Sequence, residues 1–182
     1  MPRLILLNGP PGCGKSTLAR RYVEDHPLAL DLDVDRVRDL IGGWRDQPGP
    51  AGLLARSVAL AGARAHLLGG RDVVIPQLVA RPTFIEQAER LAGEVDAVFH
   101  EVVLLDSREN ALRRFLARSR TSTDPAHLDA HRMLEQQGGL AELAAMYDRL
   151  LTVIRDRPAT KVVHTEDGRI DEAYRAFLAC LT

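Results

Sequence analysis

The chain has 182 residues, of which 46% are apolar and 27% are charged, and its formal net charge is −1. This length allows one domain with a substantial core, and the composition is that of a soluble globular protein rather than a disordered chain. The near-neutral charge also excludes the strongly basic class of nucleic-acid binders. Any anionic ligand must therefore be held by a local site.

The cysteines, histidines and apolar segments indicate a cytoplasmic protein. Cys13 and Cys180 lie at opposite ends of the sequence and form neither a disulfide framework nor a metal-ligand cluster. None of the six histidines has a spacing that indicates a metal site. No apolar stretch approaches the roughly 18–20 residues of a membrane span, and no segment has the features of a signal peptide. We therefore expect a cytoplasmic location without membrane association.

Short apolar runs alternate with amphipathic stretches, which predicts an α/β fold with a parallel sheet and crossover helices in a single domain, residues 1–182. The predicted strands are residues 3–7, 28–32, 72–75, 100–105 and 161–164. The predicted helices are residues 15–25, 35–41, 52–68, 82–93, 107–119, 127–155 and 171–180. Gly138-Gly139 should bend or split the sixth helix, and the glycines and prolines of 42–52 predict a loop.

A glycine-rich motif lies between the first strand and the first helix. The sequence GPPGCGKST fits G-x-x-x-x-G-K-[ST] from Gly9 to Ser16. Its glycines allow backbone amides to converge on phosphate oxygens at the positive end of the helix. The residues expected to bind nucleotide here are Gly9, Pro10, Pro11, Gly12, Cys13, Gly14, Lys15, Ser16 and Thr17.

Individual side chains of this motif have distinct expected roles. Lys15 can reach the terminal phosphates and neutralise the charge that develops on the leaving oxygen. Ser16 is the expected Mg²⁺ ligand, whereas Thr17 should cap or pack the helix and Cys13 should serve as a small packing residue. The alternative interpretation is a glycine-rich turn that binds no ligand.

Closely spaced carboxylates follow the second predicted strand, in LALDLDVDRVRDLIGGW. The glycine-rich motif is that of a phosphate-binding loop, or P-loop. A carboxylate at the carboxyl end of a strand beside it can orient an acceptor hydroxyl and take its proton. We assign Asp35 this role, whereas Asp33 is the base itself, an outer-sphere Mg²⁺ partner or a helix N-cap. Asp31 is expected to be solvated or structural. Arg38 either binds a polar or anionic group of the acceptor or pairs with Asp35 or Asp39.

The P-loop and the Asp35-x-x-Arg38 segment together resemble the small P-loop kinases related to chloramphenicol phosphotransferase, the zeta toxins and the kinase domain of phage polynucleotide kinase. In that family the second strand ends in an aspartate that is followed a few residues later by an arginine. The resemblance implies ATP and Mg²⁺ as cosubstrate and cofactor. It also implies the three-layer P-loop sandwich, with a five-stranded parallel sheet in the order 2-3-1-4-5. It indicates kinase chemistry rather than the identity of the acceptor.

The third predicted strand departs from the Walker-B pattern. Its apolar run ends in Pro76-Gln77, where an aspartate of the Mg²⁺ shell would be expected, and this argues against a motor ATPase. Gln77 can hydrogen-bond the substrate or a water of the metal shell, or it can cap the loop. Arg81 follows as another candidate substrate residue. Asp33 is the first substitute to test for the missing metal contact.

An arginine-rich helix follows the fourth predicted strand. Arg114 and Arg118 are four residues apart and therefore share one face, and the polar TSTDP stretch after them is typical of a mobile segment. This region, about residues 113–126, looks like the lid of the kinase family. A guanidinium from it would stabilise the transferring phosphoryl group, with Arg118 the first candidate and Arg114 the second. The alternative is a solvated basic face neutralised by Glu109 and its neighbours.

The predicted activity is ATP-dependent phosphorylation of a hydroxyl group on a small molecule. Trp44, in the predicted loop, either stacks on this acceptor or packs the loop down. Alternative functions are a polynucleotide 5′-kinase, a toxin-like nucleotide-sugar kinase and a non-catalytic nucleotide switch. A nucleic-acid acceptor is disfavoured because the near-neutral chain lacks surplus basic residues for a phosphate-tracking groove. The sequence identifies neither the acceptor nor the oligomeric state.

Overall fold

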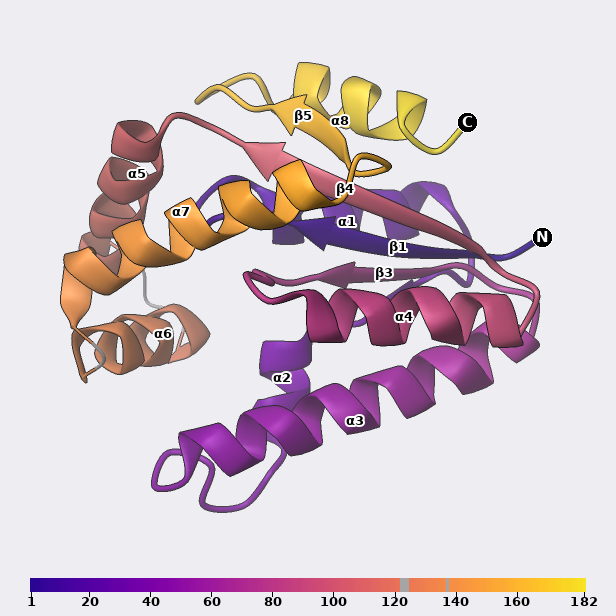
Figure 1. Ribbon diagram of the computed structural model, residues 1–182, viewed down its shortest axis with the longest axis horizontal. Helices are drawn as coiled ribbons and strands as arrows, with labels where there is room; N and C mark the ends of the chain where they lie inside the picture. Colours follow the sequence, from indigo (N-terminus) through magenta and orange to yellow (C-terminus); the bar gives the residue numbers. More distant parts are fainter. Residues whose placement is uncertain (122–124, 137) are drawn as a thin grey trace.

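The structure is a computed structural model that describes residues 1–121, 125–136 and 138–182. The side chains of residues 118–121, 125–127, 130, 133 and 136 lie outside the described part. Within it, five parallel strands form one sheet in the order β2-β3-β1-β4-β5 (Figure 1), which confirms the predicted order. The strands are β1 Arg3–Asn8, β2 Leu30–Asp31, β3 Val73–Pro76, β4 Val98–Leu105 and β5 Lys161–His164.

Helices cover both faces of the sheet and complete the expected three-layer sandwich. The helices are α1 Lys15–Asp25, α2 Val34–Asp39, α3 Pro48–Leu68, α4 Pro82–Glu94, α5 Arg108–Thr121, α6 Pro125–Gln136, α7 Gly139–Asp156 and α8 Ile170–Ala179. α3 and α4 cover one face, and α1 and α8 cover the other (Figure 1). α5 and α6 lie beyond the carboxyl ends of the central strands, where α7 packs against both. In the described ranges, no helix is long and apolar enough to cross a membrane.

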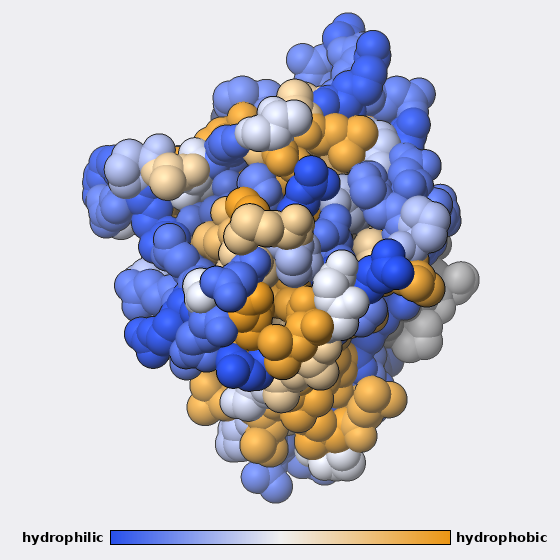
Figure 2. All heavy atoms as spheres, turned by 90° about the vertical axis from the view of Figure 1, so that its right-hand side faces the viewer, coloured by the Kyte–Doolittle hydropathy of each residue, from blue (hydrophilic) through white to orange (hydrophobic). Residues whose placement is uncertain are grey.

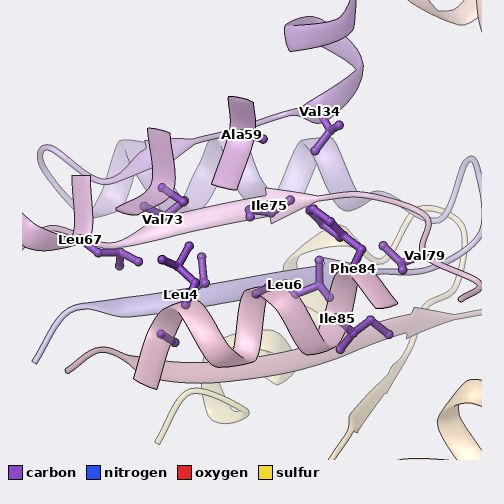
Figure 3. Close-up of a cluster of buried hydrophobic side chains, with 14 of the residues drawn as sticks. Leu4, Leu6, Val34, Ala59, Leu67, Val73, Ile75, Val79, Phe84 and Ile85 are labelled. Carbon is purple, nitrogen blue, oxygen red and sulfur yellow. The ribbon is translucent and has the colours of Figure 1, made fainter. Parts of the chain in front are cut away.

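Alternate residues of the central strands enter two separate cores. Leu4 and Leu6 of β1 lie in the core beneath α3 and α4, which Figure 3 shows together with the β3 and α4 side chains around them. Ile5 and Leu7 point to the opposite face and pack with side chains of α1 and α8. All four are fully buried. Because side chains alternate along a strand, a strand covered on both faces has to be apolar at every position, as LILL is.

Several boundaries differ from the sequence prediction, and two of the differences have a clear cause or consequence. The predicted loop 42–52 is wrong from Pro48 onward, because α3 begins there. Proline fits the first turn of a helix, where its missing N–H would have had no intrahelical acceptor. The predicted second strand, 28–32, is also too long, since β2 contains only Leu30 and Asp31.

The glycine pair splits the predicted sixth helix in two, which was one of the two expected outcomes, the other being a bend. Gly138 and Gly139 both have positive φ, at 117° and 61°. These are left-handed conformations that glycine adopts at little steric cost, so α6 ends before the pair and α7 begins at its second member. The split lets α6 and α7 pack against each other as separate elements.

Candidate functional site

The predicted P-loop connects the end of β1 to the start of α1. Gly9, Gly12 and Gly14 all have positive φ, at 144°, 82° and 96°. A Cβ built on Gly9 would lie 2.4 Å from the carbonyl oxygen of Leu104, so no other residue fits there without moving β4. The loop leads directly into α1, whose first amide groups have no intrahelical acceptor and which carries the positive end of the helix dipole. This arrangement is suited to hold a phosphate.

The Lys15 ammonium group lies across this loop. Its Nζ donates hydrogen bonds to the carbonyl oxygens of Gly9 and Pro10, both at 2.8 Å. A phosphate entering the loop can take over these bonds, because an ammonium ion prefers an anionic oxygen to a neutral carbonyl. Ser16 follows on the first turn of α1 and is half-buried, whereas Thr17 is exposed. Cys13 is buried among the α1 and α8 side chains, as the packing interpretation expects.

Asn8, the last residue of β1, fixes the P-loop to the segment that follows β3, a role that the sequence pattern did not indicate. Its fully buried side chain accepts hydrogen bonds from the backbone N–H groups of Gly9 (2.7 Å) and Val79 (2.8 Å). The side-chain amide also donates to the carbonyl oxygen of Val79 at 2.9 Å. Asn8 therefore ties the segment after β3 to the entrance of the P-loop. An asparagine directly after four apolar strand residues was the only available signal.

Asp33 caps α2, one of the roles left open by the sequence. Its Oδ1 accepts a hydrogen bond from the backbone N–H of Asp35 at 2.9 Å, in the extended backbone conformation of an N-cap. Burial raises the pKa of Asp33 above its ordinary value, and the nearby Asp35 charge adds to this effect. Hydrogen bonds from the backbone of Asp35 and Arg36 work in the opposite direction. The Asp33 carboxylate is thus engaged in a structural hydrogen bond.

Asp35 lies in the first turn of α2 and is more accessible. Its side chain is 44% exposed, and its Oδ1 lies 3.0 Å from Nη1 of Arg38. The Arg38 side chain is only 12% exposed. The ion pair was one of the two alternatives for Arg38, and it does not exclude the other. Among the described residues the buried Nε of Arg38 has no hydrogen-bond partner, so this guanidinium retains donor capacity.

Trp44 is packed rather than presented to solvent. Its side chain is 4% exposed, and the guanidinium carbons of Arg38 and Arg45 both lie 4.5 Å from the centroid of its ring. Such positions are favourable because the aromatic face is electron-rich. This geometry fits loop packing better than stacking on an acceptor. Trp44 thereby supports Arg38 from the side of the loop.

Arg45 connects the same loop to α6. Its Nε and Nη2 donate to the two carboxylate oxygens of Asp129 at 3.2 and 2.5 Å. Asp129 is buried, and the hydrogen bond from Arg45 is the main reason why its pKa is lowered. Arg132 is a weaker neighbour at 3.6 Å. A line of contacts therefore runs from Asp35 through Arg38, Trp44 and Arg45 to α6. Of these contacts, the sequence indicated only the Asp35–Arg38 pair, as one of two alternatives.

Gln77 and Asp31 provide polar oxygens at the carboxyl ends of β3 and β2. The backbone N–H of Gln77 donates to the carbonyl of Leu7 at 3.1 Å, which extends the β1–β3 pairing. Within the described part of the chain, Oε1 of Gln77 and Oδ1 of Asp31 are buried without a hydrogen-bond partner. Burial also raises the pKa of Asp31. Arg81, by contrast, is exposed at the N-cap of α4.

These oxygens bear on whether the site fits Mg²⁺. The described residues contain no group of three His, Cys, Asp or Glu side chains that could form a metal site by themselves. Mg²⁺ in phosphate-binding sites uses one or two protein ligands and keeps several waters. Ser16, on the first turn of α1, can supply one such protein ligand.

The arginine-rich helix lies against the P-loop. A Cβ built on Gly12 would lie 3.2 Å from Cβ of Arg114, so α5 closely approaches the loop. The guanidinium of Arg114 is paired with the buried carboxylate of Asp106 at 3.0 Å, which means that Asp106 rather than Glu109 neutralises it. Arg118 lies one turn further along α5, but its side chain lies outside the described residues, as does part of the predicted lid.

The strand order, the glycine-rich turn and Lys15 together define a P-loop protein of the α/β class. A family model, AAA_33, described as an AAA domain, matches residues 4–143. The chain belongs to this family. A search of curated proteins found no match.

Solved structures of low sequence identity share the fold. A candidate kinase from Chloroflexus aurantiacus is 16% identical with a TM-score of 0.68, and the match covers 99% of this chain and 96% of that one. A gluconokinase from Sinorhizobium meliloti is 19% identical, with a TM-score of 0.63 and coverages of 99% and 91%. A tunicamycin resistance protein from Deinococcus radiodurans is 15% identical, with a TM-score of 0.61 and coverages of 98% and 95%.

The Asn8 contacts predict a large loss of stability in Asn8→Ala. The substitution leaves two buried N–H groups and one buried carbonyl without partners, each at a cost of about 1–3 kcal/mol. We expect the free energy of unfolding, measured by urea denaturation, to fall by about 3 kcal/mol or more. Asn110→Ala, which removes a part-buried hydrogen bond to Asp106, is the control and should cost about 1 kcal/mol. Similar small losses in both variants would contradict the role given to Asn8.

The Arg45–Asp129 pair predicts a pH-dependent contribution to stability. Because its folded-state pKa is lowered, Asp129 adds stability above its unfolded pKa of about 4, and this stability is lost as pH falls through the folded value. Thermal unfolding of wild type, Arg45→Ala, Asp129→Ala and the double variant should give a favourable coupling between the two residues near neutral pH. The coupling should shrink as acid protonates the Asp129 carboxylate, whereas a pH-independent value would count against the ion pair.

Proposed function

We propose that this chain transfers the γ-phosphate of Mg-ATP to a hydroxyl group of a small-molecule acceptor. The observation that carries the proposal is a phosphate-binding loop with Lys15 after β1, together with an accessible carboxylate, Asp35, after β2 in the same parallel sheet. The loop by itself accounts only for nucleotide binding. The carboxylate adds a group that can activate an acceptor. Membership of the AAA_33 family and the shared fold with a gluconokinase support this proposal.

The donor side consists of the P-loop and the start of α1. The amides at the start of α1 and the Lys15 ammonium hold the phosphates, with Lys15 moving from the carbonyls of Gly9 and Pro10 to the phosphate oxygens. Ser16 would hold Mg²⁺, with Gln77 or Asp31 binding its waters. The ion neutralises charge on the phosphate oxygens.

On the acceptor side, Asp35 is the better candidate for the base. Asp33 already holds the N-terminus of α2, whereas Asp35 has an exposed carboxylate with Arg38 beside it. Asp35 orients the acceptor hydroxyl and takes its proton as the oxygen bonds to the γ-phosphorus. The bond from that phosphorus to the bridging oxygen breaks, and ADP leaves with its new charge neutralised by Lys15.

Further residues complete the proposed site. Arg38, with its free buried Nε, would bind a polar or anionic group of the acceptor, and Gln77 and Arg81 remain candidate acceptor contacts. Arg114 already lies beside Gly12, and it would exchange Asp106 for a phosphate oxygen. Arg118, one turn further along α5, remains the first candidate for stabilising the transferring group.

Lys15→Ala should lower phosphoryl transfer by at least about 10²-fold, because it removes the cation that stabilises the leaving oxygen. The assay follows label from γ-labelled ATP into a panel of polyhydroxylated acceptors. Lys161, the chain's other lysine, bonds carbonyls near the C-terminus, so Lys161→Ala is a matched control and should keep normal turnover. Normal turnover in Lys15→Ala would remove the kinase proposal.

Asp35→Asn should lower turnover by about 10²–10⁴-fold with little change in ATP affinity, because the amide cannot take the acceptor's proton. Asp33→Asn should keep both stability and most activity, since asparagine is as favourable at a helix N-cap as aspartate is. Asp33→Ala should lose about 1 kcal/mol of stability with the cap. Turnover, ATP titration and melting temperature measure these effects. A larger loss of turnover in Asp33→Asn than in Asp35→Asn would transfer the base role to Asp33.

A further inference from the structure

One face of α3 is apolar and exposed. Leu54 and Val58 are each 56% exposed, Leu68 is 65% exposed, and Ala61 and Ala65 between them are also exposed. In Figure 2, apolar side chains gather over the lower part of the molecule, where α3 lies in Figure 1. Scattered exposed leucines are ordinary, but a continuous apolar row along one helix indicates a contact surface.

The spacing of this row is that of a helix–helix seam. Residues 54, 58, 61, 65 and 68 alternate steps of four and three, which is the heptad spacing of paired helices. The opposite side of α3 is already used, because Ala51, Ala55, Ala59, Ala63 and Leu67 are buried against the rest of the domain. α3 therefore carries two apolar rows, of which the domain covers only one.

Polar groups beside the row are already satisfied. The Ser57 hydroxyl donates to the backbone carbonyl of Leu53, and the Arg64 guanidinium pairs with Glu94 at 2.7 Å. Covering the row would therefore leave no new unpaired polar group. The charged or titratable residues of α3 are only Arg56, Arg64 and His66. These are too few for the lysine- and arginine-rich polar face of a helix that binds a membrane surface. A protein helix is the better occupant.

We infer that the row binds the same row of a second copy of this chain, in an antiparallel pair about a two-fold axis. A two-fold contact requires a self-complementary surface. The middle of the row is self-complementary because an antiparallel register can place Leu54 against the partner's Ala65 and Val58 against the partner's Ala61, so that a large residue faces a small one in both pairs. A helix of 21 residues is about 31 Å long. Its exposed face would bury on the order of 1,000 Å² over both copies, the lower limit for a specific dimer.

Sedimentation velocity of the full chain over a concentration series tests this interface, and it does not depend on phosphoryl transfer. The wild type should dimerise with increasing concentration. Val58→Glu places two like charges in the seam and should raise the dimer dissociation constant at least about 100-fold, with an unchanged melting temperature because Val58 is exposed. Leu151→Glu introduces the same charge at an exposed leucine of α7 and should leave the dimer intact.

Several results would overturn the inference. A wild type that stays monomeric at about 100 µM, well above the micromolar dissociation constant expected of a small interface, would assign the row to a different partner. A dimer that persists in Val58→Glu, or that dissociates equally in Leu151→Glu, would place the interface elsewhere. If Val58→Glu fails to fold, Ala61→Glu on the same row takes its place with the same expectation.

Discussion

The turn that leaves β1 is the constraint on which the rest of the site depends. The chain has to pass so close to β4 that a Cβ atom at position 9 would lie 2.4 Å from the backbone carbonyl oxygen of Leu104. Asn8 fixes this turn by bonding both the loop that follows β1 and the segment that follows β3. Because these bonds are buried, they are costly to break, and the start of α1 is held in place. A loop that binds phosphate through its backbone needs this rigidity, since each amide must be in position before the ligand arrives.

The proposed acceptor side, which follows β2, is built differently, from side chains. A continuous line of ion pairs and guanidinium–ring contacts links five residues, in the order Asp35, Arg38, Trp44, Arg45 and Asp129. The line begins at a partly exposed carboxylate and ends at a buried one on α6. The line therefore connects α6 to the proposed base through direct side-chain contacts. For the proposed phosphoryl transfer, a fixed donor side and a linked acceptor side would help to exclude water from the site.

The fold was predictable to the extent that it follows from local pattern. Apolar runs such as LILL and the P-loop motif fixed the class, and family resemblance supplied the strand order. Predicted element boundaries were wrong where one residue type occurs in two kinds of structure. Proline is common in loops, which is why 42–52 was predicted as a loop, yet Pro48 lies in the first turn of α3. The predicted site residues are all in or near one edge of the sheet, apart from the undescribed Arg118 side chain. Asn8, Arg45 and Asp129 were missed because their partners lie 71 or 84 residues away, and no spacing along the chain encodes such contacts.

The central claim is that phosphate leaves ATP for an acceptor hydroxyl rather than for water. Phosphorus NMR of a reaction containing the chain, Mg-ATP and one acceptor at a time tests it most directly, because donor, product and free phosphate give separate signals. For the correct acceptor, the account predicts that ADP and a new phosphate monoester appear in equal amounts, with little inorganic phosphate. ADP accompanied only by inorganic phosphate, across a broad panel of hydroxyl compounds, would contradict it.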